Sequence, residues 1–193
     1  MANNNVSYVC GHCGHQVAGI DYGQVPKPPN KRDNQAIKGE YASKHKNAFQ
    51  LCPNCRRGTV IVDGIQHPSA PAGAFVRHLP SDVEASWQEA RRSYAVGAYT
   101  ASVLMCRKLL MHMAVDHAGA KEGEYFAPCI NKLIESGELP EKHKPALEKI
   151  RKAGGDGAHK LEAISEADAK VTLVITETCL RNLYEIPAQV LAP

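Results

Sequence analysis

Two pairs of cysteines near the start of the chain constrain its fold more than any other feature. Each pair has two residues between its cysteines, in the sequences CGHCG and CPNCRRG, and the four positions are Cys10, Cys13, Cys52 and Cys55. Two such turns joined by a hairpin place four thiolates in a tetrahedron, the arrangement of a structural zinc site. So small a module has little apolar surface to bury, and bound metal would supply its folding energy. We therefore predict a zinc ribbon holding one structural Zn²⁺.

Other uses of the four cysteines stay open at this point. Iron in a rubredoxin-like site uses the same two turns, and His12, His15 or His45 could replace a cysteine as ligand. A redox dithiol is disfavoured, because one pair would suffice and no βαβ pattern surrounds either pair. The 38 residues between the pairs exceed the usual ribbon interval, and the polar stretch 23–39 accounts for the excess.

Composition divides the chain into two parts. Residues 1–65 carry short β-branched runs beside the cysteines and predict a small β module. Residues 66–80 contain three prolines and are typical of a linker. Residues 81–190 carry helical patterns interrupted by glycines. The predicted fold is therefore α+β: a zinc-ribbon β module followed by an all-α antiparallel bundle of five helices.

Local signals predict the first three helices. Ser81 is expected to cap the first, which runs from residue 82 to about residue 96. The second helix, residues 98–118, is apolar almost all round and is expected to be the buried centre of the bundle. Within it Arg107 needs a partner if it is buried, and Glu89 or Glu177 could supply one. A third helix is expected over residues 125–136.

The remaining helices have equally clear signals. Pro140 suits the first position of a fourth helix that reaches about residue 153. Ser165 and Asp168 form a capping box for the fifth, which is expected to stop before Pro187. Three further cysteines fall within these helical patterns and are expected to be buried as small hydrophobes, namely Cys106, Cys129 and Cys179.

Charge is distributed unevenly along the chain. Residues 1–78 hold nine Lys and Arg against four Asp and Glu, a net of +5, whereas residues 79–193 hold fourteen against sixteen, a net of −2. A polyanion would therefore first meet the cysteine module, where Arg56 and Arg57 are candidate nucleic-acid contacts. A modest positive bias also serves solubility, and the two interpretations have equal weight. The start of the chain lacks a signal-peptide pattern and no apolar run spans a membrane, so we expect a cytoplasmic protein.

A second candidate site lies in the sequence IRKAGGDGAH, which follows the fourth predicted helix. It brings Arg151, Lys152, Asp156, His159 and Lys160 close together around three glycines. A guanidinium can stabilise charge on a phosphorane, and an imidazole can move the proton of a ribose 2′-OH. This chemistry requires no metal. The structural alternative is that Arg151 pairs with a neighbouring carboxylate and that His159 holds the turn.

The helical part resembles the HEPN superfamily, in its bacterial unknown-function branch that is often preceded by a zinc ribbon. The matching sequences are LPSDVEASWQEARRSYAVGAYTASVLMCRKLL, residues 79–110, and IRKAGGDGAH. The resemblance implies a helical bundle that commonly forms a homodimer and has RNA or nucleotide as its ligand. In catalytic members an Arg and a His from each of two subunits form a shared ribonuclease site, and such proteins cluster among toxins and anti-phage systems.

Two functional hypotheses follow, ahead of a third in which a transcription-type regulator binds DNA through the ribbon, because no helix-turn-helix pattern supports the third. In the first, the protein is a metal-independent endoribonuclease of toxin or anti-phage defence type, with catalytic Arg151, Asp156 and His159, and with Lys152 and Lys160 contacting RNA. In the second, it is a non-catalytic module that dimerises through its helices and binds nucleic acid or a protein partner in a defence system. Seven residues separate Arg151 from His159, a longer interval than in catalytic members of the family, and this favours the second.

Overall fold

The computed structural model describes residues 7–21, 48–62, 64–154 and 163–191. The chain forms two compact units, residues 1–71 and residues 72–193. Several candidate residues lie outside the described ranges and receive no structural account, namely His45, Asp156, His159 and Lys160. No helix in the described part of the chain combines the length and apolar character needed to span a bilayer.

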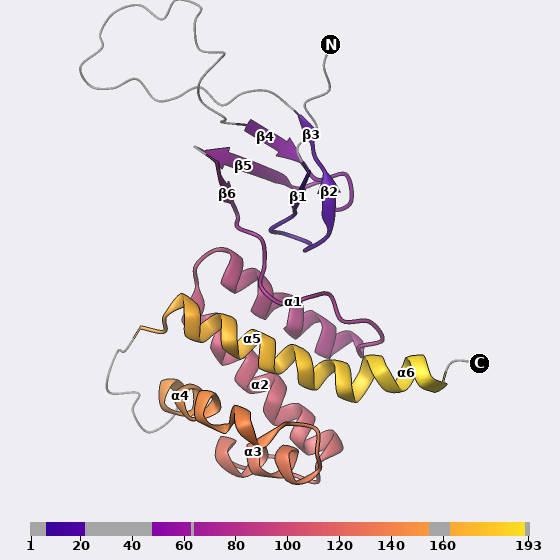
Figure 1. Cartoon of the computed structure of the whole chain (residues 1–193), viewed down its shortest axis with the longest axis vertical. Helices are drawn as coiled ribbons and strands as arrows, with labels where there is room; N and C mark the ends of the chain where they lie inside the picture. The colour runs from indigo at the N-terminus through magenta and orange to yellow at the C-terminus, as the bar shows by residue number, and fades with distance from the viewer. Residues whose placement is uncertain (1–6, 22–47, 63, 155–162, 192–193) are drawn as a thin grey trace, which may run out of the picture. The chain divides into compact units, whose positions relative to one another are not determined.

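The first unit consists of two small antiparallel sheets (Figure 1). One sheet pairs β1 with β2, and the other is a meander in the order β3, β4, β5, β6. The strand bounds are β1 Ser7–Val9, β2 Gln16–Ala18, β3 Ile20–Asp21, β4 Ala48–Leu51, β5 Gly58–Val62 and β6 Ile65–His67. One cysteine turn joins β1 to β2, and the other joins β4 to β5. The predicted β module carrying four cysteines is confirmed.

The apolar core of this unit is very small. Its buried cluster consists of Tyr8, Cys10 and Cys52. Beside it, Gln50 and Thr59 face each other across β4 and β5 and are fully buried, although both are polar. Burial of one tyrosine and two thiols gives too little hydrophobic free energy to order six strands. We therefore expect the fold of this unit to depend on metal binding by its cysteines.

The second unit is a packed bundle of helices. The bounds are α1 Ser81–Ala95, α2 Tyr99–His117, α3 Phe126–Glu135, α4 Lys144–Gly154, α5 Glu166–Leu180 and α6 Ile186–Leu191, with short 3₁₀ and π segments η1 Glu141–His143 and η2 Arg181–Glu185. The five predicted helices are all present, and α6 continues the direction of α5 toward the C-terminus (Figure 1).

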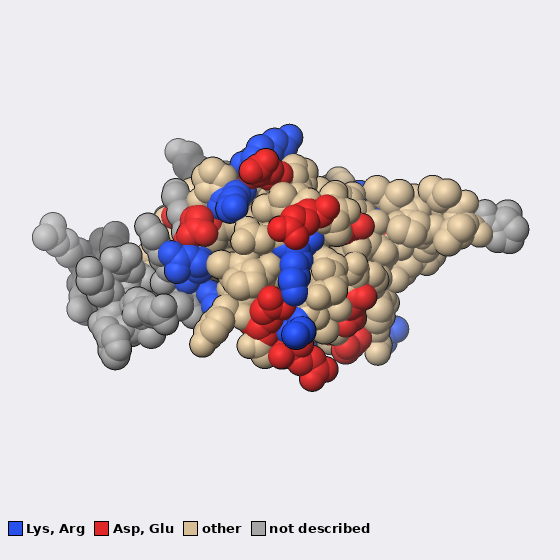
Figure 2. Space-filling view, turned by 90° about the horizontal axis from the view of Figure 1, so that it is seen from below, with Lys and Arg blue, Asp and Glu red and all other residues tan. Residues whose placement is uncertain are grey.

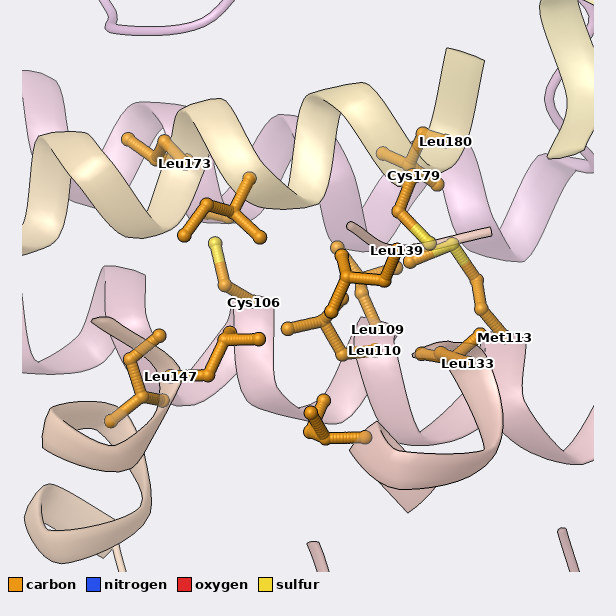
Figure 3. Close-up of a cluster of buried hydrophobic side chains, with 14 of the residues drawn as sticks. Cys106, Leu109, Leu110, Met113, Leu133, Leu139, Leu147, Leu173, Cys179 and Leu180 are labelled. Carbon is orange, nitrogen blue, oxygen red and sulfur yellow. The ribbon is translucent and has the colours of Figure 1, made fainter. Parts of the chain in front are cut away.

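Helix α2 is the centre of this bundle, as its composition predicted, and it packs against α1, α3, α4 and α5. Its buried face meets side chains from α3, α4 and α5 (Figure 3). The three cysteines of the helical unit are 0–1% exposed, so the prediction that they are buried hydrophobes is confirmed. The central side chains labelled in Figure 3 are Cys106, Leu109, Leu110, Met113, Leu133, Leu139, Leu147, Leu173, Cys179 and Leu180.

The capping predictions had different outcomes. The Ser165 hydroxyl accepts a hydrogen bond from the Asp168 backbone N–H at 3.1 Å, which confirms the cap of α5. At α1 the predicted cap is wrong, because Ser81 is already helical and Pro80 is the N-cap, with no side-chain cap bond. The Pro80 carbonyl accepts from the Glu84 N–H at 2.8 Å, and the extended backbone of Pro80 suits a cap position without help from a hydroxyl.

The last helix does not stop before Pro187. After α5 the chain makes the π turn η2, in which the Ile186 N–H donates to the Arg181 carbonyl, and then continues as α6 through Pro187. Proline lacks an N–H and its ring collides with the carbonyl four residues earlier in a regular α-helix. The wider π turn just before Pro187 shifts the hydrogen-bond register, and this allows the helix to continue.

The stretch expected to be a linker contributes to both units. Its first residues, Gln66 and His67, belong to β6. Residues 72–77, called the strap below, pack on the helical unit, and Val76 within it is 1% exposed. Its backbone is bound by Trp87, Arg91, Glu177 and Glu185 at distances of 2.7–3.3 Å. Composition could not reveal this packing, because the helical residues that bind the strap are 13–108 positions away in the sequence.

Candidate functional site

The four cysteine sulfurs of the first unit gather at one point. All four Sγ atoms lie within 4.8 Å of one another. The Cys10 and Cys55 sulfurs are 3.8 Å apart, as are those of Cys13 and Cys52. A tetrahedron with metal–sulfur bonds of about 2.3 Å has sulfur–sulfur edges of about 3.8 Å. A disulfide requires only about 2 Å between sulfurs. These four cysteines are therefore placed to hold a metal ion.

The two cysteine turns have the same backbone. In the first turn, the Gly14 N–H donates to the Cys10 carbonyl at 2.8 Å. In the second, the Arg56 N–H donates to the Cys52 carbonyl at 2.9 Å. Each turn is closed by a further bond from its first cysteine, with Cys10 N–H donating to the His15 carbonyl at 2.9 Å and Cys52 N–H to the Arg57 carbonyl at 3.0 Å. The backbone geometry of the two turns thus directs the four sulfurs toward one point.

Hydrogen-bond donors surround the sulfurs. The His12 backbone N–H donates to the Cys10 sulfur at 3.4 Å, and the Asn54 side-chain amide donates to the Cys13 sulfur at 3.6 Å. Such donors stabilise thiolates and orient metal ligands. The His12 ring instead reaches the Gly58 carbonyl through Nε2 at 2.9 Å, and His15 Nδ1 lies 3.2 Å from the Cys13 carbonyl. Among the described residues the cluster contains cysteines alone, and neither histidine belongs to it.

The surroundings shift the pKa values of the first pair in opposite directions. Burial, opposed by backbone N–H bonds, raises the pKa of Cys10 to about 12. Burial also acts on Cys13, but hydrogen bonds from the His15 backbone and the Asn54 side chain prevail and lower its pKa to about 6. A divalent cation at the centre would favour the thiolate form of all four cysteines.

The two arginines predicted to contact nucleic acid lie on the second cysteine turn. Arg56 and Arg57 are both exposed. Arg56 has a backbone φ of 58°, in the left-handed region that residues with a side chain seldom adopt. Two adjacent exposed guanidiniums are available to a polyanion at this turn.

Arg151 lies in the last turns of α4, where its Nε donates to the Glu148 carboxylate at 2.8 Å. This is the pairing that the structural alternative anticipated. Its backbone carbonyl accepts a hydrogen bond from Arg107 NH1 at 3.2 Å. The Arg107 guanidinium also lies over the Phe126 ring, 4.6 Å from the ring centroid. The Arg107 guanidinium of α2 therefore lies against the backbone of Arg151 near the C-terminal end of α4, close enough for the positive charge of Arg151 to lower the pKa of Arg107.

A family model for a domain of unknown function, DUF4145, matches residues 88–192. This match covers more than half of the chain. The chain belongs to the DUF4145 family. Neither the search of curated proteins nor the search of solved structures found a match. The DUF4145 match begins within α1 and extends to the end of the described chain, so it includes the helical bundle, Arg107 and Arg151. The four-cysteine module precedes it.

Within the DUF4145 region, Arg151 is the one predicted catalytic residue that the structure describes. Lys152 follows it in α4, and its side chain is not among those described. Asp156, His159 and Lys160 lie outside the described residues. Their roles remain predictions from the sequence.

Neither Glu89 nor Glu177, the two possible partners considered from the sequence, contacts Arg107 among the described interactions. Glu177 accepts hydrogen bonds from the Ala74 backbone N–H and from Arg181, so it serves the strap and its own helix. Arg107 instead contacts an aromatic ring and a backbone carbonyl. The signal for a special role was visible, because Arg107 interrupts an apolar helix. Its actual partners could not be read from the sequence, since they come from α3 and α4.

Proposed function

We propose that this protein acts on RNA as a metal-independent endoribonuclease of toxin or anti-phage defence type. The observation that supports this most is the contact of the Arg107 guanidinium with the backbone carbonyl of Arg151 near the end of α4, next to the sequence GGDGAH. Positive charge there suits a scissile phosphate. The HEPN kinship that motivates the proposal is itself part of it, and DUF4145 membership is compatible with it.

In the proposed reaction, the ribose 2′-oxygen attacks the adjacent phosphorus and the bond to the 5′-oxygen breaks. His159 takes the proton of the 2′-OH and returns a proton to the departing 5′-oxygen. Arg151 stabilises the charge on the phosphorane, and Asp156 assists within the same glycine-rich sequence. Lys152 and Lys160 hold the neighbouring phosphates. The products are a 2′,3′-cyclic phosphate and a 5′-hydroxyl.

The test incubates the purified full chain with RNA in a magnesium-free buffer containing a chelator, beside the variant His159→Ala. The metal content of the protein is measured before and after this incubation, so that any loss of metal from the four cysteines to the chelator is detected. A substrate with a single 2′-deoxy nucleotide at the cut site serves as a chemical control. Cleavage that requires both His159 and the 2′-OH supports the proposal. Equal cleavage by both proteins, or cleavage by neither, contradicts it.

The second candidate is a non-catalytic module that binds nucleic acid or a protein component of a defence system. The ion pair between Arg151 and Glu148 favours it, because this contact occupies the guanidinium expected to act in catalysis. It predicts no cleavage, together with RNA binding that weakens at high salt and when Arg56 and Arg57 are both changed to Gln. Binding that is indifferent to salt and to these two residues would exclude it.

The metal bound by the four cysteines is proposed to be zinc with a structural role. Sulfur edges of 3.8 Å suit a four-thiolate tetrahedron, which leaves no position for substrate or water. Zn²⁺ accepts this geometry without redox chemistry. Elemental analysis after expression in medium containing both zinc and iron should find one zinc per chain. Visible absorption from ferric thiolate would instead identify iron.

We further propose that the helical unit forms a homodimer through α6. Its large apolar side chains Ile186, Val190 and Leu191 are 50–80% exposed. The projecting end of the bundle in Figure 2 shows no Lys, Arg, Asp or Glu. A surface of this kind is seldom left in water. Light scattering should give twice the chain mass, and Val190→Lys with Leu191→Lys should give the monomer; a monomeric wild type contradicts the proposal.

A further inference from the structure

Arg107 is held in a fixed position by two contacts of different kinds. Its guanidinium carbon lies 4.6 Å from the centroid of the Phe126 ring, and its NH1 donates to the Arg151 carbonyl at 3.2 Å. The ring covers one face of the guanidinium and removes water from it. The hydrogen bond sets its orientation at the end of α4. Only one of its N–H groups is used in these contacts, so the others can serve an additional acceptor.

The charge of Arg107 has no counter-ion in the described part of the chain, since no carboxylate pairs with it. Burial, and after it the positive charge of Arg151, lowers the pKa of Arg107. A partly buried guanidinium next to a second one is unfavourable unless an anion accompanies them. Such an arrangement is typical of sites that bind a negatively charged group.

The other charged groups nearby leave this place net positive. Glu148 pairs with Arg151 at 2.8 Å, and the two side chains are 46% and 40% exposed. Exposed pairs of this kind are weak, so Arg151 can leave Glu148 for a stronger acceptor. A small hollow next to the Phe126 ring is lined by Lys144 as well as Glu148. Among these described residues, two guanidiniums and one ammonium therefore lie near one carboxylate.

We propose that Arg107 and Arg151 together bind one phosphate group, with Arg107 as the preset half of the site. The guanidinium fork fits two phosphate oxygens, and two forks from different helices can bracket a single phosphate. If the proposed function holds, this is a backbone phosphate of the RNA, and Arg107 is a phosphate-positioning residue additional to Arg151. The same chemistry would also hold a free phosphate or pyrophosphate. The competing role is structural: Arg107 caps the end of α4 and binds nothing else.

The experiment compares the full, metal-loaded protein with Arg107→Gln and Arg107→Lys. The matched control is Arg92→Gln, which removes an exposed arginine of α1 whose Nε donates only to a carbonyl of its own helix. Binding to a short fluorescent single-stranded RNA is measured over a series of salt concentrations. We expect Arg107→Gln to weaken binding about tenfold. For the same variant, a plot of the logarithm of the RNA association constant against the logarithm of salt concentration should have a slope smaller in magnitude by about 0.7. Arg107→Lys should fall between the wild type and Arg107→Gln, and Arg92→Gln should match the wild type.

A second measurement separates this site from the RNA function. Inorganic pyrophosphate should raise the melting temperature of the wild type, and this gain should be lost in Arg107→Gln. If the wild type binds no RNA but shows the Arg107-dependent gain, the phosphate site stands and the RNA function fails. If Arg107→Gln is less stable yet binds RNA with the wild-type slope, Arg107 is only a helix cap and the proposal is overturned. The proposal is also overturned if the wild type neither binds RNA nor gains melting temperature with pyrophosphate.

Discussion

Arg56 occupies, in the second cysteine turn, the backbone position that Gly14 occupies in the first. Both follow the second cysteine of their pair, and both have positive φ, 58° for Arg56 and 73° for Gly14. Both donate an N–H to the carbonyl of the first cysteine. The two turns are therefore one structure built from different residues. Glycine adopts this conformation without steric cost, whereas arginine does not.

Replacing Arg56 with Gly should therefore stabilise the ribbon. We expect the free energy of unfolding of the metal-loaded first unit to rise by up to about 1 kcal/mol, because the strain of a left-handed Cβ is removed. Arg57→Gly is the control, since Arg57 is exposed but is not among the residues with positive φ. The wild type, Arg56→Gly and Arg57→Gly are compared by their melting curves and by the chelator concentration at which each loses its metal. A less stable Arg56→Gly would mean that its side chain has a structural role of its own.

Loss of a single metal ligand should unfold the first unit and leave the helices intact. Cys52→Ser removes a fully buried ligand from a unit whose apolar core is otherwise Tyr8 and Cys10. Metal content should drop from one ion per chain to near zero, while the helical circular dichroism persists, because the bundle has its own core. The control is Cys129→Ser, which changes a buried cysteine of the bundle and should leave the metal content of the protein unchanged. A Cys52→Ser protein that retains metal would show that three thiolates suffice.

Arg91 should be far more important for stability than its neighbour Arg92. Arg91 is 2% exposed and donates to the Ala72 and Gly73 carbonyls at 3.3 and 2.9 Å, which attaches the strap to α1. Arg91→Met leaves these acceptors without their charged donor and should cost about 3 kcal/mol of unfolding free energy. Arg92→Met, on the exposed face, should change it by less than about 0.5 kcal/mol. Denaturant titration gives both values, and equal effects would contradict this account of the strap.

The three cysteines of the bundle should be unreactive in the native protein. Burial raises the pKa of Cys106 and of Cys179 to about 12, and it also raises the pKa of Cys129. At pH 8 these groups are therefore neutral thiols, which are poor nucleophiles. Ellman's reagent should modify none of them while the protein is folded and metal-loaded. All seven cysteines should react in denaturant with chelator. Rapid native labelling at any of the three would show that the bundle opens.

Acid should weaken the contact between Glu124 and Lys132. The Lys132 ammonium lies 2.8 Å from the Glu124 carboxylate and, with the Lys121 backbone N–H, lowers the pKa of Glu124. A lowered folded-state pKa stabilises the fold above the unfolded pKa of about 4.3, and this contribution disappears as pH falls through the folded value. The stability of Glu124→Gln should therefore decline less between about pH 5 and 3 than that of the wild type. An equal decline of the free energy of unfolding in both proteins over this pH range would contradict this prediction.

Local sequence signals predicted the parts of this protein that depend on near neighbours. The two cysteine turns close through bonds over a few residues, and the Ser165 hydroxyl caps α5 only three residues away. Where local signals failed, distant packing or a competing geometry decided the outcome. Pro187 ended the helix in the prediction, yet the π turn before it allows the chain to continue. The strap reads as a linker until its partners on α1 and α5 are known.

The sequence alone determined that four cysteines gather and that an apolar second helix lies at the centre of a bundle, because spacing and periodicity fix both. Only the tertiary structure showed that the sulfurs lie 3.8 Å apart across the two turns. Likewise, it alone placed Arg107 between the Phe126 ring and the end of α4. These relationships join residues 19–45 positions apart, and contacts at such separations depend on how whole elements pack rather than on any local preference.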